Sequence, residues 1–331
     1  MTRRRAASWQ YEAMTWLSVG VLVAGVVAVL SIRPATNALA ASPTPVFHES
    51  ERVTHVRVPV RTTVKVPAQA RAARPRFQLS VPTAEGFGPP PGPQADAVPA
   101  ATAPPESRFA VIIGVTHYRA PTHETIGGAA DARFIASMLQ QSGWLPGNMR
   151  VLTDEAATGP AVRAAMNWLV SVSRPGTFSF FHYSGHVQQG GGVQYLWPVD
   201  HDLIANSDFA ATMHRAGGRL WVDIAGCESG GFIRDLPSST VLVTTSSEVT
   251  QKSYEYPDWG MSVWSGLLFD LGTAQNGADA NGDGRVTMGE AIRYATYYAH
   301  RLTVYQTPNG PQIPQSAGDP VRGWTLADPP A

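Results

Sequence analysis

Cysteine is nearly absent from this chain of 331 residues, which contains only one, Cys227. A single cysteine excludes a disulfide within the chain, which leaves catalysis, intermolecular pairing or chance as reasons for the thiol. Net charge is absent as well, because 25 Lys and Arg balance 25 Asp and Glu. Residues 1–107 hold 11 basic and 6 acidic side chains, and the remainder holds 14 and 19. A mildly acidic domain behind a basic arm argues against a nucleic-acid-binding core, so we expect no nucleic-acid partner.

A charge-free apolar run, residues 15–32, follows three arginines at positions 3–5 and precedes the small residues Ala38-Leu39-Ala40. This order is typical of an export signal, and we expect residues 1–40 to be a signal peptide or a signal anchor. As a helix rising about 1.5 Å per residue, the run would span roughly 27 Å, close to a bilayer core of about 30 Å. Cleaved or retained, it predicts an extracytoplasmic protein, either periplasmic or secreted, or anchored to the membrane by residues 15–32.

Residues 41–107 lack the apolar surface needed to fix one conformation, because they are rich in Pro, Ala and Arg. We interpret them as a disordered linker. Residues 52–66 alternate Val with polar or basic side chains and could pair as an edge strand, although Pro59 argues against it. A solvated tether is the favoured role, with attraction to anionic lipid or cell-envelope polymer as the alternative.

From residue 108 onward, apolar runs typical of buried strands alternate with segments of helical period. This pattern predicts a three-layer α/β/α sandwich with a mostly parallel central sheet. The folded domain is expected over residues 108–305, with 306–331 as a C-terminal tail. The expected strands are 109–115, 150–153, 178–183, 219–225 and 240–246, and the expected helices are 127–143, 156–173, 207–216, 260–272 and 289–303.

Two reactive residues, His186 and Cys227, each lie just past the end of an expected strand. Ligand sites in parallel sheets gather at the carboxyl ends of strands, and an imidazole within reach of a thiol is the usual way to generate a thiolate near neutral pH. Neighbouring glycines would let backbone N–H groups approach a substrate carbonyl. His182 lies inside a strand and is interpreted as a core histidine. No role is assigned to His117, His123, His201 or His214.

Several motifs in order give the chain a family resemblance. FAVIIGVTHY (109–118), GGAADA (127–132), RVLTDEAAT (150–158), FFHYSGH (180–186) and GCESGG (226–231) resemble the motifs of caspase-like cysteine peptidases, the group that includes bacterial metacaspases. The similarity covers roughly residues 108–305.

The resemblance implies a caspase fold that cleaves protein or peptide substrates through a dyad of His186 and Cys227, with the backbone N–H groups of Cys227 and Val187 as the oxyanion hole. The chain departs from the family pattern at two positions: Val187 replaces the usual Gly, and Ala225 replaces an Asp that metacaspases carry two residues before the Cys. These changes keep open a catalytically inactive caspase-fold module that binds partners or acts as a scaffold in the cell envelope. A calcium-dependent adhesin is a third alternative.

The same resemblance implies cleavage after Arg or Lys, read by acidic groups in the pocket, because a carboxylate pairs with a guanidinium in a bidentate way. Asp131 and Ser184 match two substrate-binding positions of the family. Asp223 is a candidate to substitute for the acid missing at Ala225, displaced by two positions. The Cys motif has the legumain form CESG, so cleavage after Asn or another residue also stays open.

A second motif, DANGDGRVTMGE at residues 279–290, fits the calcium-loop pattern D-x-N-x-D-G-x5-E. Such a loop binds calcium through alternate oxygen ligands, a sharp turn at Gly284 and a closing carboxylate. We expect a single structural Ca²⁺ site, although a polar loop that caps the next helix is the alternative. Its expected ligands are Asp279, Asn281, Asp283, Arg285 (through its carbonyl), Thr287 and Glu290.

Overall fold

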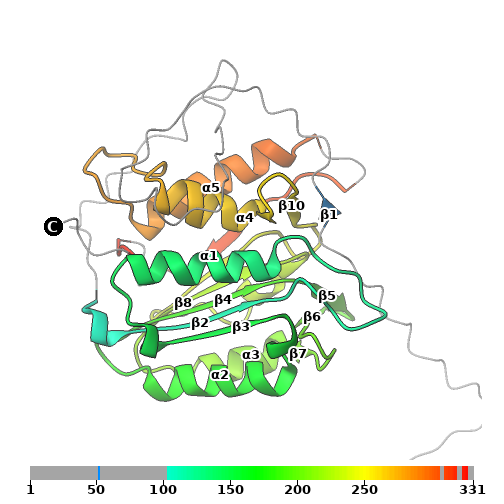
Figure 1. Cartoon of the computed structure of the whole chain (residues 1–331), viewed down its shortest axis with the longest axis horizontal. Helices are drawn as coiled ribbons and strands as arrows, with labels where there is room; N and C mark the ends of the chain where they lie inside the picture. Colours follow the sequence, from blue (N-terminus) through cyan, green and yellow to red (C-terminus); the bar gives the residue numbers. More distant parts are fainter. Residues whose placement is uncertain (1–50, 53–102, 306–308, 319–322, 327–331) are drawn as a thin grey trace, which may run out of the picture. The chain divides into compact units, whose positions relative to one another are not determined.

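A six-stranded sheet forms the middle layer of the molecule (Figure 1). The computed structural model describes residues 51–52, 103–305, 309–318 and 323–326. Four neighbouring strand pairs are parallel and the edge strand β12 runs antiparallel, which confirms the expected mostly parallel sheet. In order across the sheet, the strands are β12 (Gln315–Ala317), β9 (Val241–Thr245), β8 (Arg219–Ala225), β4 (Phe178–Ser184), β2 (Arg108–Gly114) and β3 (Met149–Thr153).

Helices cover both faces of this sheet (Figure 1). One face packs under α1 (Gly128–Gln141), α4 (Val263–Ser265), the π-helix η6 (Gly266–Ala274) and α5 (Met288–Thr303), and the other under α2 (Gly159–Val172) and α3 (Asn206–Met213). The three-layer α/β/α sandwich is therefore confirmed. All five helical segments expected from the sequence are present, with ends shifted by a few residues.

The period of two along the strands divides the core into two apolar clusters. On β2, Ala110 and Ile112 join the cluster under α1, whereas Val111 and Ile113 join the cluster over α2. Side chains alternate between faces along a strand, so a strand covered on both sides reads as an unbroken apolar run. β4 is buried along its whole length for the same reason.

Short elements surround the carboxyl ends of the central strands. A small sheet contains β5 (Val187–Gly190), β6 (Val193–Leu196) and β7 (Ile204–Ala205), and another contains β1 (Glu51–Arg52), β10 (Tyr254–Tyr256) and β11 (Met261–Ser262). Of the edge strand considered over residues 52–66, only Arg52 belongs to the described residues, and β1 pairs in parallel with β10. Single 3₁₀ turns are η2 (Pro105–Ser107), η3 (Pro146–Asn148), η4 (Asp154–Ala156) and η5 (Ser229–Ile233).

The C-terminal region takes part in the fold beyond residue 305, where the sequence analysis ended the domain. β12 pairs with β9, and Leu326 is only 2% exposed. Trp144 Nε1 donates to the carbonyl of Leu326 (2.8 Å), and the ring of Trp324 lies 5.4 Å from that of Phe178. Periodicity could not reveal this docking, because it depends on contacts with residues almost 200 positions earlier.

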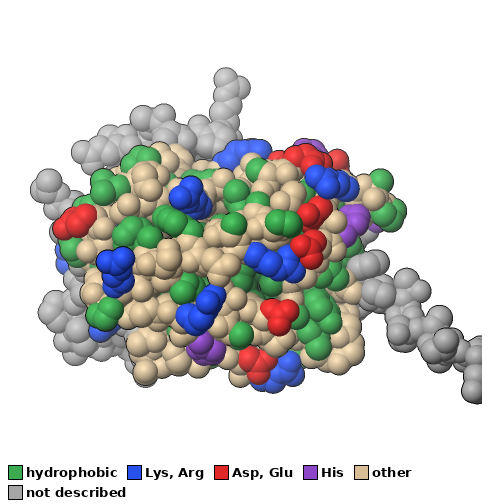
Figure 2. All heavy atoms as spheres, turned by 90° about the horizontal axis from the view of Figure 1, so that it is seen from below, with side chains coloured by type: hydrophobic (Ala, Val, Ile, Leu, Met, Phe, Trp, Pro, Cys, Tyr) green, Lys and Arg blue, Asp and Glu red, His purple; other side chains and the backbone are tan. Residues whose placement is uncertain are grey.

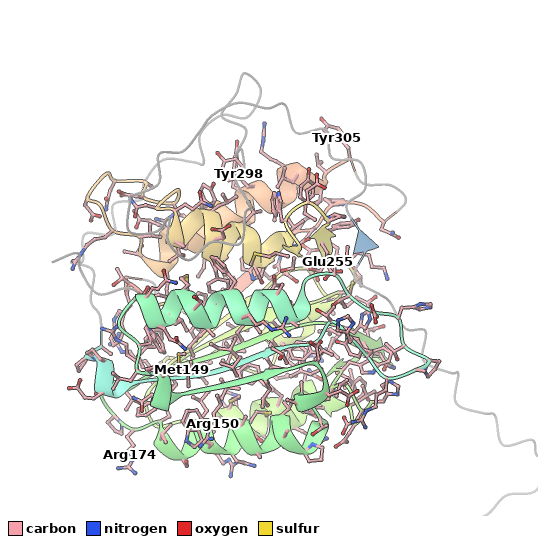
Figure 3. The ribbon with its side chains drawn as sticks, viewed as in Figure 1. Met149, Arg150, Arg174, Glu255, Tyr298 and Tyr305 are labelled. Carbon is pink, nitrogen blue, oxygen red and sulfur yellow. The ribbon has the colours of Figure 1, made fainter. Side chains whose placement is uncertain are left out.

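Charges of both signs are interspersed on the face formed by α2 and α3 (Figure 2). Arg163 Nη2 lies 3.2 Å from Asp202 Oδ1, and the guanidinium of Arg150 lies 4.8 Å from the centre of the Trp168 ring (Figure 3). Arg163 is thus paired with an acid on this face, whereas Arg150 lies over an aromatic ring.

The expected export signal, residues 1–40, lies outside the described residues. Across the described ranges, no helix combines the length and the apolar character that crossing a membrane requires.

If the C-terminal segment contributes to the core, Leu326→Ala should lower the free energy of unfolding by about 2–4 kcal/mol, since it removes a buried side chain and leaves a cavity. Equilibrium denaturation in urea measures this. Tyr305→Ala is the control, because Tyr305 is 88% exposed and its loss should change stability by less than about 0.5 kcal/mol. Equal stability of Leu326→Ala and wild type would contradict the docking of this segment.

Candidate active site

The register of the central sheet brings His186 and Cys227 to neighbouring strand ends. β4 and β8 pair in parallel up to Ser184 opposite Ala225, and Gly185 N–H donates to the carbonyl of Ala225 (3.1 Å). His186 and Cys227 each follow two residues later, at the carboxyl edge where loops of a parallel sheet converge. The two strand ends that the sequence singled out are therefore adjacent.

The imidazole of His186 is buried, with 1% of the residue exposed, and its two nitrogens differ. Nε2 lies 2.9 Å from the carbonyl oxygen of His123, whereas Nδ1 has no hydrogen-bond partner among the described residues. A carbonyl only accepts, so Nε2 carries the proton and Nδ1 keeps its lone pair. Burial lowers the pKa of His186 to about 4, because the charged form is poorly solvated. The ring is therefore a neutral base with a fixed tautomer.

Cys227 begins a sharp turn and has no exposed surface. The N–H of Ser253 donates to its sulfur (3.4 Å), and the carbonyl of Ser253 lies 3.8 Å from the same atom. The next residue, Glu228, has φ +56°, a left-handed backbone conformation that is uncommon for a residue other than glycine. Glu228 N–H donates to Gln251 (2.7 Å), which holds this turn in place.

Gly226 sits in a crowded position before Cys227. A Cβ atom there would lie 2.6 Å from Val187 Cγ2, so any larger residue would displace the strand end. Ser246 Oγ and Ser247 Oγ both donate to the Gly226 carbonyl at 3.0 Å. Val187 itself belongs to the apolar cluster over α2 and α3, so the side chain that replaces the usual glycine packs into the core.

Asp131 and Ser184 are brought together beside the strand end of β4. Ser184 Oγ and Ser262 Oγ each donate to Asp131 Oδ2 (2.6 Å), and Ser262 N–H donates to Oδ1 (3.1 Å). The carboxyl group is fully buried, which raises the pKa of Asp131, while the two hydroxyl donors act in the opposite direction. Asp131 and Ser184 are thus joined by a hydrogen bond, and Ser184 lies two residues before His186 in the sequence.

Asp223 lies deeper, inside the core. Its carboxylate accepts hydrogen bonds from His182 Nδ1 (2.8 Å), Trp264 Nε1 (2.8 Å) and Thr244 Oγ1 (2.5 Å), and it is fully buried. Asp223 thus lies among core side chains, and its expected role as a substitute for the missing pocket acid stays a prediction. His182 is fully buried and paired with Asp223, which confirms it as a core histidine.

The segment containing β10 and β11 connects these groups. Ser253, just before β10, contacts Cys227, and Ser262 of β11 contacts Asp131. Glu255 accepts from Ile126 N–H (2.8 Å) and Gly127 N–H (2.6 Å) and so caps the start of α1 (Figure 3). Sequence reasoning missed Ser253, Ser262 and Glu255, because their contacts lie up to 131 residues away.

His123 and the tyrosines Tyr118 and Tyr183 were also missed. His123 contributes its backbone carbonyl, which no sequence pattern marks. Both tyrosines lie within the motifs FAVIIGVTHY and FFHYSGH, and their place in those motifs was the one available signal.

Side chains of the expected calcium loop hydrogen-bond to the backbone of the same loop. Asp279 accepts from the N–H groups of Gly282 (2.8 Å), Asp283 (3.2 Å) and Gly284 (2.9 Å), and Gly284 supplies the turn with φ +81°. Glu290 Oε1 lies 3.3 Å from Ala280 N, so the last and second positions of the loop meet. In the described part of the chain, no three His, Cys, Asp or Glu side chains converge as a metal cluster.

Comparison with known families gives this site a context. The family model described as the caspase domain matches residues 107–285, more than half of the chain. The chain belongs to the caspase-domain family. The resemblance seen in the ordered motifs is thereby confirmed, and the parallel sheet with its flanking helices is the fold expected for it.

Several curated relatives of the chain are metacaspases. Metacaspase-1 of Mycosarcoma maydis is 32% identical over 165 residues, which cover 44% of this chain and 40% of that protein. Metacaspase-1 of Schizosaccharomyces pombe is 32% identical over 153 residues, 39% of this chain and 35% of that protein. The match thus spans less than half the length of these relatives. A solved structure from Geobacter sulfurreducens covers 65% of this chain and 94% of its own at 16% identity, with a TM-score of 0.46, too low to bear on function.

Proposed function

We propose that the protein is a cysteine endopeptidase in which Cys227 attacks a peptide carbonyl and His186 transfers protons. The observation that carries this proposal is the state of His186: a buried imidazole with its Nε2 held by a carbonyl and its Nδ1 without a partner among the described residues. A base nitrogen left unpaired in the interior is costly, so such a group indicates a use. Its neighbour at the adjacent strand end is the one thiol in the chain.

The reaction needs no further group for proton transfer. His186 Nδ1 takes the thiol proton as the sulfur bonds to the carbonyl carbon, and the carbonyl π pair moves to oxygen. The oxyanion receives hydrogen bonds from the N–H groups of Cys227 and Val187. The imidazolium then protonates the leaving amine, the C–N bond breaks, and a thioester remains. Water, deprotonated by His186, cleaves that acyl-enzyme and regenerates the thiol.

Access to the sulfur requires a local movement. Cys227 has no exposed surface, and the segment at Ser253 contacts its sulfur. A peptide carbonyl can therefore reach Cys227 only after the chain around Ser253 shifts.

The direct test is digestion of a peptide library by the purified full chain, wild type against Cys227→Ala, with calcium and with a chelator. Wild type should cut peptides and Cys227→Ala should lose at least about 10³-fold in rate, since the covalent route is removed. If neither protein cuts any peptide, the proposal fails in favour of a non-catalytic binding module. If both cut equally, the cutting does not depend on Cys227 and the assignment of the nucleophile fails.

For specificity, we propose a preference for Arg or Lys before the cut bond, read by Asp131. The support is the placement of this carboxylate, which is joined to Ser184, the last residue of β4, two residues before His186. The three hydrogen bonds from Ser184 and Ser262 favour the charged form of the carboxylate. A buried anion binds a guanidinium or ammonium group strongly once water is displaced.

Asp131→Asn should therefore lower kcat/KM for an Arg substrate by about 10- to 100-fold relative to a neutral analogue, the size expected for one charge-assisted hydrogen bond. Asp223→Asn is the matched control. It removes a buried carboxylate from the core, so it should reduce stability without changing the preference. A preference that shifts in Asp223→Asn and not in Asp131→Asn would contradict the assignment.

We also propose a structural Ca²⁺ site at residues 279–290. Carboxylate, amide, carbonyl and hydroxyl oxygens are the ligands that calcium prefers, and the loop brings Glu290 Oε1, at its last position, within 3.3 Å of Ala280 N at its second. Asp279, Asn281, Asp283 and Glu290 would hold the ion with the carbonyl of Arg285 and with Thr287. Thr287 and Glu290 also form the capping box of α5, so bound calcium would stabilise the start of that helix.

At about 10 mM CaCl₂, a site with a dissociation constant of about 10⁻⁴ to 10⁻³ M should raise the free energy of unfolding by about 1.4–2.7 kcal/mol over the chelator. Denaturation of wild type and Asp283→Asn measures this, and the gain should nearly vanish in the variant. Asp258→Asn, outside the loop, should keep the full gain. Equal gains in wild type and Asp283→Asn would exclude this loop as the site.

Finally, we propose an extracytoplasmic location, with residues 1–40 as signal peptide or anchor. Free thiols are prone to oxidation in such compartments, and the complete burial of Cys227 would protect it there.

A further inference from the structure

Two buried tyrosines surround the backbone of His186. Tyr183 lies on β4 and its hydroxyl is within 2.8 Å of the His186 carbonyl and 2.7 Å of the Trp197 carbonyl. It also accepts from Trp197 N–H (3.1 Å). His186 and Trp197 flank the two ends of the β5–β6 hairpin, so one hydroxyl ties both ends of that hairpin together.

Tyr118 holds His186 from the other side. Its hydroxyl accepts from His186 N–H (2.7 Å), and its ring centre lies 4.6 Å from that of the imidazole. The fit leaves no space at Gly185, where a Cβ atom would come within 2.4 Å of the Tyr118 hydroxyl. Burial raises the pKa of Tyr118 well above its usual value, so the hydroxyl stays protonated.

The carbonyl bonded by Tyr183 belongs to the same peptide unit as the N–H of Val187. Val187 opens β5, the edge strand of its small sheet. The hairpin turns at Gly191 (φ +60°) and Gly192 (φ +82°), a type I′ turn that makes Gly190 and Val193 a hydrogen-bonded pair. Pairs alternate from there, so Val187 and Leu196 form a non-hydrogen-bonded pair and the Val187 N–H points away from β6.

A hydrogen bond to an amide carbonyl fixes the plane of that amide and strengthens donation by its N–H. The Tyr183 hydroxyl has one proton, which it shares between the carbonyls of His186 and Trp197, and through the first of these it acts in this way on the peptide unit between His186 and Val187. The side chain at 187 is buried in the apolar cluster over α2 and α3, where it packs against Gly226.

We propose that Tyr183 is a positioning residue for the oxyanion-binding N–H of Val187, and that Tyr118 positions His186. This inference rests on the proposed peptidase function. It assigns the two hydroxyls to two different steps: Tyr183 to stabilisation of the oxyanion and Tyr118 to proton transfer.

A pair of inhibitors tests the role of Tyr183 in the full chain. A peptide aldehyde reacts with the thiol: His186 Nδ1 takes the thiol proton, sulfur bonds to the aldehyde carbon, and the π pair moves to an oxygen that occupies the oxyanion site. The matching peptide alcohol binds without this step. We expect Tyr183→Phe to reduce the ratio of aldehyde to alcohol affinity by about 10- to 100-fold, less than or similar to removal of an oxyanion donor. It should lower kcat by a similar factor and leave KM nearly unchanged.

Tyr195→Phe, on β6 of the same hairpin, is the control and should leave the ratio unchanged. Tyr118→Phe should lower kcat but alter the ratio less than Tyr183→Phe does. If Tyr183→Phe keeps the wild-type ratio, or weakens both inhibitors equally, the inference is wrong.

Two further outcomes are informative. If wild type neither cuts peptides nor prefers the aldehyde, the peptidase proposal itself fails, which separates that failure from the loss of the Tyr183 inference alone.

If Tyr183→Phe does not fold, 3-fluorotyrosine at position 183 replaces it, since it keeps the ring and makes the hydroxyl a stronger donor. The ratio should then rise, and an unchanged or lower ratio would overturn the inference.

Discussion

The hydrogen bond from His186 Nε2 to the carbonyl of His123 is the interaction on which the rest of the site depends. It fixes which nitrogen carries the proton, and burial keeps the ring neutral. His123 lies in the connection between β2 and α1, and Glu255 holds the end of that connection at Ile126 and Gly127. The state of the base therefore depends on a loop, a helix start and a strand far apart in the sequence.

Residues of the candidate site lie on both faces of the central sheet. Asp131 and Ser184 lie with α1 on one side, while Val187 packs with α2 and α3 on the other. Tyr183 and Ser184 are consecutive on β4, so their side chains point to opposite faces of the sheet. Tyr183 contacts the ends of the β5–β6 hairpin, and Ser184 contacts Asp131. The parallel register then places Cys227 next to both sets. A single pair of strands thus positions both residues of the proposed dyad, His186 and Cys227.

Much of the fold follows from local patterns, whereas the connections within the site do not. The run FAVIIGV predicted β2, the strand ends pointed to His186 and Cys227, and alternation placed His182 in the core. By contrast, β12 and Leu326 pack against β9 and Trp144, which lie much earlier in the sequence. Periodicity cannot reveal such long-range contacts. Asp223 illustrates what the sequence could not predict. Its position two residues before Ala225 suggested a pocket acid, but its hydrogen bonds with His182, Thr244 and Trp264 are tertiary contacts that the spacing does not reveal.

The most direct test of this account is the protonation state of His186, followed by NMR of the full chain labelled with ¹⁵N-histidine. His186→Gln identifies its signals among those of the nine histidines. The account predicts a neutral ring with the proton on Nε2 that titrates at a pKa of about 4. Titration near the ordinary histidine value of about 6.5, or a proton on Nδ1, would contradict it.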